Sequence, residues 1–96
     1  MRRTNFEPLG LVIDKVFRDL GLEKKMKEIQ IKENWKHVVG PLFDKSTKKI
    51  TIFNHTLFVS VDSAAIRNEL MLNKTEIITK LNAIVNQQII VDMVVR

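Results

Sequence analysis

The sequence predicts a small α+β domain in which helices pack on one face of a three-stranded sheet. Apolar residues first recur at helical spacing, then alternate over two short segments, return to helical spacing and finally alternate again near the end. The 96 residues can bury one hydrophobic core but not two, so we expect a single domain over 1–96.

The first apolar stripe predicts an N-terminal helix over 8–20. Pro8 suits the first turn of this helix, and Gly21 suits its C-terminal stop. The stripe consists of Leu9, Val12, Ile13, Val16, Phe17 and Leu20.

The stretch that follows contains two apolar sets on opposite sides of a helical wheel. One straight helix could not bury both sets against a single core. We therefore expect a short helix near 22–29, a break near Gln30 and a second helix from about 31. The Gly40-Pro41 pair should kink or end this second helix.

Two alternating segments predict an antiparallel hairpin, with strands at roughly 49–53 and 56–62. Asn54-His55 lies between them and is typical of a tight turn. Phe58 alternates with the apolar residues of its strand and should point to the opposite face of the sheet.

The last third of the chain predicts helical structure followed by a strand. Asp62-Ser63 is a helix-capping sequence. We expect either one long bent helix or two helices, 63–72 and 74–86, and favour two. Asn86 is the expected stop, because asparagine tolerates the left-handed conformation. Residues 89–95 alternate again and predict the final strand.

The sequence lacks the motifs of several classes of enzyme and of membrane proteins. The chain has no cysteine, no glycine-rich phosphate loop, and no second ligand at metal spacing from His37 or His55. We therefore expect no enzyme, cofactor, metal site or small-molecule substrate. No apolar run approaches the roughly 20 residues of a membrane span, so we expect a cytoplasmic protein without a membrane partner.

The net charge of +5 and the pI near 9.8 favour an anionic partner such as nucleic acid. Three lysines lead into the hairpin with only Asp44 opposing them. The candidate phosphate contacts are Lys45, Lys48, Lys49, Arg67 and Lys74. Phe58 could stack on bases of a single strand, or it could be covered by other elements.

The only tryptophan, Trp35, precedes Val-Val-Gly on the second predicted helix. It is either a core anchor or an aromatic hot spot for a partner protein. On the second interpretation, Trp35, Val39 and Gly40 are the candidate partner contacts.

Five motifs follow one another in a characteristic order. They are Trp35-Lys36-His37-Val38-Val39-Gly40-Pro41, Leu57-Phe58-Val59-Ser60-Val61, Ser63 to Leu70, Ile77-Ile78 with Leu81-Asn82, and Ile89 to Arg96. Together these motifs resemble the DciA family of bacterial proteins. The resemblance implies a KH-like (type II-like) domain that binds the replicative helicase DnaB and assists its loading onto single-stranded DNA. It also implies a nucleoid-associated protein.

One departure bears on nucleic-acid binding. KH domains that grip RNA use a Gly-x-x-Gly loop between two helices, but the corresponding link here is Met71-Leu72-Asn73-Lys74. We therefore expect no sequence-specific RNA binding from fold kinship alone. A stand-alone KH-like nucleic-acid-binding protein without a helicase partner is the alternative function, and the sequence leaves the oligomeric state open.

Overall fold

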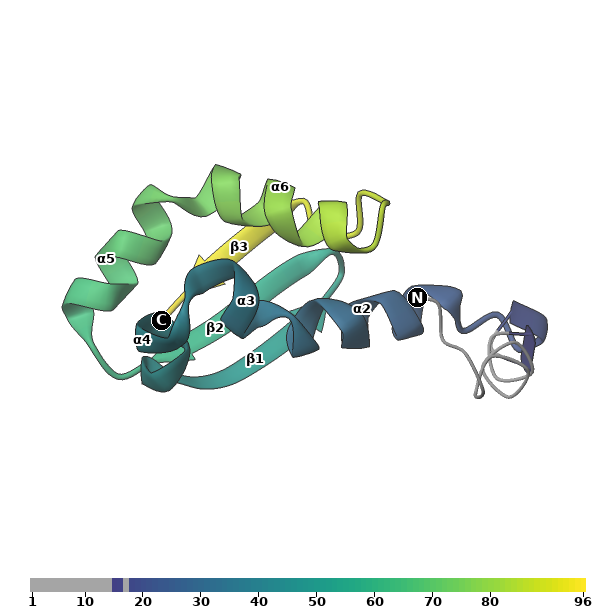
Figure 1. The fold of residues 1–96 in the computed structure, drawn as a ribbon, viewed down its shortest axis with the longest axis horizontal. Helices are drawn as coiled ribbons and strands as arrows, with labels where there is room; N and C mark the ends of the chain where they lie inside the picture. Colours follow the sequence, from purple (N-terminus) through teal and green to yellow (C-terminus); the bar gives the residue numbers. More distant parts are fainter. Residues whose placement is uncertain (1–14, 17) are drawn as a thin grey trace.

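A computed structural model describes residues 15, 16 and 18–96. The predicted helix over 8–20 falls mostly on residues 1–14 and 17, which lie outside the described residues. The described elements are α2 (Glu23–Glu33), α3 (Trp35–Val39), α4 (Pro41–Ser46), β1 (Thr47–Phe53), β2 (Thr56–Val61), α5 (Ala64–Leu72), α6 (Lys74–Ile84) and β3 (Asp92–Val95) (Figure 1).

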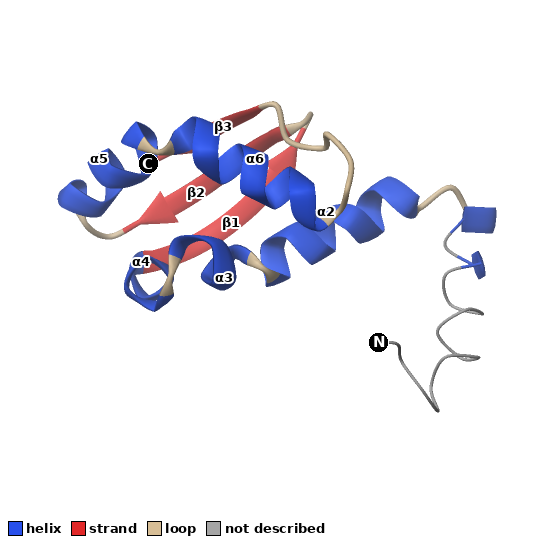
Figure 2. Cartoon of the chain, turned by 45° about the horizontal axis from the view of Figure 1, so that its top comes forward, coloured by secondary structure: helices blue, strands red, loops and turns tan. Residues whose placement is uncertain are grey.

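The strands form one mixed sheet in the order β1-β2-β3. β1 and β2 are antiparallel, whereas β2 and β3 are parallel because α5 and α6 form the crossover between them. Figure 2 shows the helices gathered on one face of this sheet. The predicted α+β class is confirmed, and the arrangement is consistent with a KH-like fold.

The predicted hairpin is confirmed, with a two-residue turn at Asn54-His55 and the pair Phe53–Thr56 closing the ladder. Both turn residues are left-handed, with φ of 52° and 64°. Positive φ at both central positions is the geometry of a type I′ turn, whose twist matches that of the strands.

The core lies between the sheet and the helices. On β2 the inward side chains Leu57, Val59 and Val61 are buried, and Phe58 points to the other face as predicted. The largest fully buried side chains are Trp35, Ile31, Leu57, Leu70, Leu81, Ile89, Ile90 and Val59. This apolar burial is the main stabilisation of so small a domain.

The predicted helix break near Gln30 is wrong, because α2 continues to Glu33 and the break falls at Asn34. The prediction assumed that both apolar sets are buried in the core. In the structure Leu22 and Ile29, from the first set, are 39% and 41% exposed, so they face outward. The second set starts with the buried Ile31 on α2 and continues with Trp35 on α3, so α2 does not have to end before it. The Asn34 side-chain amide donates to the carbonyl of Gln30 at 2.8 Å and helps to end the helix.

Gly40 separates α3 from α4, as predicted for the Gly40-Pro41 pair. Its φ of 93° and ψ of 162° are accessible to glycine and costly for other residues. Pro41 then opens α4 at the first helical position, where a missing N–H costs nothing.

The favoured two-helix alternative is confirmed for the crossover, with the break at Asn73. Ser63 caps α5 by accepting the backbone N–H of Ile66 at 3.3 Å, and Asn86 follows α6 with a φ of 54°. The final strand is shorter than predicted and begins at Asp92 rather than at residue 89. Before it, the side chain of Asn82 accepts the backbone N–H groups of Ile89 and Ile90, and the N–H of Val91 donates to the carbonyl of His55 in the hairpin turn.

Candidate partner and nucleic-acid interfaces

Trp35 lies inside the core, with 1% of its surface exposed. Its indole N–H donates to the hydroxyl of Thr47 at 3.0 Å, and that hydroxyl donates to the carbonyl of Phe43 at 2.9 Å. The indole therefore ties α3, α4 and the start of β1 together. It offers no surface to a partner, and it positions the residues around it.

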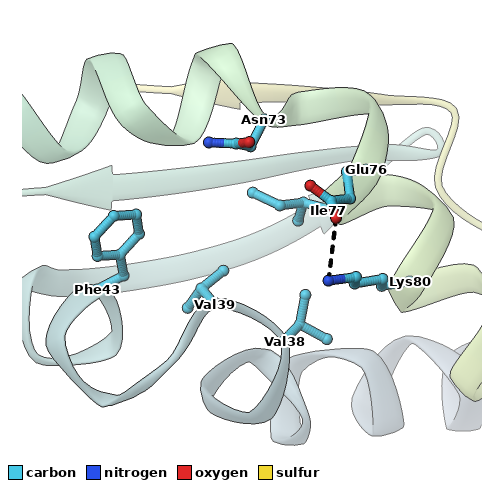
Figure 3. Close-up of a pocket in the computed structure, with 7 residues that line it drawn as sticks. All are labelled: Val38, Val39, Phe43, Asn73, Glu76, Ile77 and Lys80. Carbon is cyan, nitrogen blue, oxygen red and sulfur yellow. Dashed lines mark ion pairs between the residues drawn. The ribbon is translucent and has the colours of Figure 1, made fainter.

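Val39 contributes to a small cleft between α3, α4 and α6, with a volume of about 120 Å³. The Glu76 carboxylate and the Lys80 ammonium form an ion pair of 3.3 Å beside it (Figure 3). The cleft is lined by Val38, Val39, Phe43, Asn73, Glu76, Ile77 and Lys80. Gly40 is not among these residues, but its left-handed backbone sets the angle between the two helices that supply the apolar wall.

The structure does not bring all the predicted phosphate contacts together. The Lys48 ammonium lies 3.1 Å from a carboxylate oxygen of Asp62, and the Lys74 ammonium lies 3.0 Å from one of Asp92. Asp62 follows the end of β2, whereas Asp92 pairs with Thr56 at its start. These points are separated by six residues along β2, roughly 20 Å at 3.3 Å per residue.

Both ion pairs lower the pKa of their carboxyl group. The hydrogen bond from Lys48 lowers the pKa of Asp62 below its ordinary value of 3.8, and that from Lys74 lowers the pKa of Asp92. Each lysine charge is thus partly balanced by a carboxylate that stays ionised at neutral pH.

The other three predicted cations have no carboxylate at ion-pair distance among the residues that the structure describes. Lys45 and Lys49 are exposed at the junction of α4 and β1. Arg67 is partly exposed in the first turn of α5, which starts where β2 ends. With Lys48, they gather at one end of the sheet.

Arg96 is a further cation of this region that sequence reasoning missed. Its backbone N–H donates to the carbonyl of Val59 and its carbonyl accepts from the N–H of Val61, both at 2.8 Å, so it extends the ladder of β3 opposite Ser60. Its guanidinium carbon lies 5.1 Å from the centre of the Phe58 ring. Strand alternation was the available signal, because Met93 and Val95 point inward and residue 96 must point outward.

Within the described part of the chain, no group of three or more His, Cys, Asp or Glu side chains is placed to hold a metal ion. Likewise, none of the described helices is long and apolar enough to cross a membrane.

Comparison with known proteins identifies the family. A family model described as Dna[CI] antecedent, DciA, matches residues 8–95. The chain belongs to the DciA family. Comparisons with curated proteins and with solved structures found no match. The family match over residues 8–95 confirms the resemblance that the sequence motifs indicated. The DciA family has a helicase-loading role in bacterial DNA replication and is not a known enzyme family.

Proposed function

We propose that this DciA-family chain is a non-enzymatic adaptor that binds the replicative helicase DnaB and assists its loading onto single-stranded DNA. The observation that carries the proposal is the family match over residues 8–95. The adaptor binds one conformation of the helicase ring better than another and so shifts its population toward DNA capture. The helicase alone hydrolyses nucleotide, and both proteins act in the cytoplasm at the nucleoid.

The helicase contact on this proposal is the surface around the cleft of α3, α4 and α6. Apolar side chains beside an ion pair are typical of a protein-binding hot spot with a polar rim. Val39 contacts the helicase directly. Gly40 and the buried Trp35 act by holding the wall of the cleft in place.

The contact with single-stranded DNA is weak and electrostatic. Lys45, Lys48, Lys49 and Arg67 meet phosphates at one end of the sheet. Lys74 stands apart at the other end and adds at most one further phosphate contact. Each neutralised phosphate on a single strand contributes a slope of about 0.7 to the dependence of log affinity on log salt.

A binding experiment with the purified cognate helicase tests the proposal. We expect a complex at micromolar concentration with the unaltered chain, and a weaker one with Val39→Ser. The matched control is Val91→Ser, because Val91 is 58% exposed in the loop before β3 and lies away from the cleft.

Absence of any complex with the unaltered chain at micromolar concentration would contradict the adaptor function. If that chain still bound single-stranded DNA, the result would favour the stand-alone nucleic-acid-binding protein instead. Equal weakening by Val39→Ser and Val91→Ser would contradict the placement of the contact at the cleft.

A further inference from the structure

The sheet face turned away from the helices carries side chains in three ordered rows. Register and strand alternation define them, since the inward residues of β2 and β3 are buried. The rows across β1, β2 and β3 are Lys49, Ser60 and Arg96; then Thr51, Phe58 and Val94; then Phe53, Thr56 and Asp92.

We infer that this open face binds single-stranded nucleic acid, with a base stacked on Phe58 and the sugar-phosphate backbone on Lys49 and Arg96. The inference rests on the proposed function, and it names the surface that meets the nucleic acid. Lys49 and Arg96 flank Ser60, and strand spacing places their Cα atoms about 10 Å apart. Phe58 stands one row further along, about 7 Å away.

Phe58 has the position and exposure of a stacking platform. It lies on the central strand and is partly exposed, and the short side chains of Thr51 and Val94 are its neighbours on either side. The Arg96 guanidinium lies over this ring, with its central carbon 5.1 Å from the ring centre, and is a second planar group on which a base can stack. Aromatic rings and guanidinium planes accept any base by stacking, so such a site tolerates sequence.

The charges on this face are distributed unevenly between its two ends. Lys49 and Arg96 lie in one end row, and no carboxylate pairs with either among the described residues. The other end row contains Asp92, which repels phosphate although Lys74 balances it. Phosphates therefore favour the cationic row, and bases extend over Phe58 toward Phe53, which is 72% exposed.

The link between α5 and α6 argues against the alternative route used by RNA-gripping KH domains. That route needs glycines that let the backbone approach phosphate. Here Met71 and Leu72 are 52% and 79% exposed, and no glycine is present. These apolar side chains offer phosphate neither a charge nor a hydrogen bond, whereas the sheet face offers cations and an aromatic ring together.

Fluorescence anisotropy with a labelled 20-nucleotide oligo-dT, the matching oligo-rU and a duplex of the same length tests the inference. Phe58→Leu should weaken single-strand binding about tenfold, and Phe58→Tyr should retain it. Lys49→Gln and Arg96→Gln should each lower the salt slope by about 0.7. Lys32→Gln on α2 is the charge-matched control, which should leave the slope unchanged. The two oligonucleotides show whether DNA or RNA is preferred, and the duplex should bind less tightly because pairing hides the base faces.

Less than a twofold loss with Phe58→Leu, or equal effects of Lys32→Gln and Lys49→Gln, would overturn the inference. Emission from the single, buried Trp35 establishes that each variant is folded. Helicase binding should survive Phe58→Leu. If this variant lost the helicase but kept single-stranded DNA, the face would be a protein surface and the inference would fail. If the unaltered chain bound single-stranded DNA but no helicase, and Phe58→Leu weakened that DNA binding, the adaptor function would fail and the inference would stand.

Discussion

Replacing Asn82 with alanine should remove the side-chain hydrogen bonds that hold Ile89 and Ile90, the segment that leads into β3, against α6. Its side-chain oxygen accepts the backbone N–H groups of Ile89 at 3.0 Å and Ile90 at 2.9 Å, and its amide nitrogen donates to the carbonyl of Ile90 at 2.8 Å. The same two isoleucines are 1% and 0% exposed and belong to the core. One side chain on α6 thus satisfies three backbone groups next to buried apolar residues.

The magnitude follows from these three bonds. Each hydrogen bond contributes about 1 kcal/mol net, and backbone groups left unsatisfied in a buried site cost at least as much. We expect Asn82→Ala to lower the free energy of unfolding by about 3 kcal/mol, a large part of the 5–15 kcal/mol typical of a domain. With a urea m-value of about 1.5 kcal/mol/M, the midpoint falls by about 2 M.

Urea unfolding followed by Trp35 emission is the assay, since the chain has one tryptophan and it is buried. Asn82→Asp keeps both acceptor bonds and should cost less than Asn82→Ala. Asn68→Ala is the control, because Asn68 is exposed on α5 and should change stability by no more than about 0.5 kcal/mol. If Asn82→Ala lowered the free energy of unfolding by less than about 1 kcal/mol, these three hydrogen bonds would not be what holds the segment before β3.

Three further predictions concern the backbone and the surface ion pairs. Gly40→Ala should cost about 1–3 kcal/mol in urea unfolding, all of it from the φ of 93°, because a Cβ there meets no atom within 4 Å; a neutral result would contradict this. Asn86→Gly should leave the midpoint nearly unchanged and Asn86→Ala should lower stability by about 1 kcal/mol, since φ is 54°; equal midpoints would argue against left-handed strain. Lys48→Gln should raise the pKa of Asp62 toward its ordinary value in an NMR titration, because the hydrogen bond from Lys48 is the largest cause of the lowering, and an unchanged pKa would exclude the pair. Because the folded pKa is lowered, the stability from this pair is present above the ordinary pKa of 3.8 and is lost as pH falls through the folded pKa.

Local patterns predicted most of the fold because they act over a few residues. Asn54-His55, Ser63 and Asn86 have turn and cap preferences that hold in almost any context, and the structure confirms all three. The error near Gln30 came from a tertiary question, namely which of two apolar stripes faces the core. Periodicity shows that a stripe exists, but it does not show what covers it.

The candidate sites show the same division. Sequence reasoning found the lysines at the junction of α4 and β1, but it could not show that Lys48 pairs with Asp62 while Lys74 pairs with Asp92 at the other end of the sheet. These pairings depend on strand register, which connects residues far apart in the chain. The position of Arg96 opposite Ser60 depends on the same register. Sequence left two interpretations of Trp35 open, and its 1% exposure shows that it is a core anchor.

The most direct test of the adaptor function measures how many helicase rings stay on circular single-stranded DNA after a salt wash, with and without the chain. We expect the chain to increase the number of retained rings, Val39→Ser to reduce this gain, and Val91→Ser to preserve it. We also expect the chain alone to hydrolyse no ATP. Equal retention with and without the chain, with both proteins folded and present at micromolar concentration, would contradict the adaptor function.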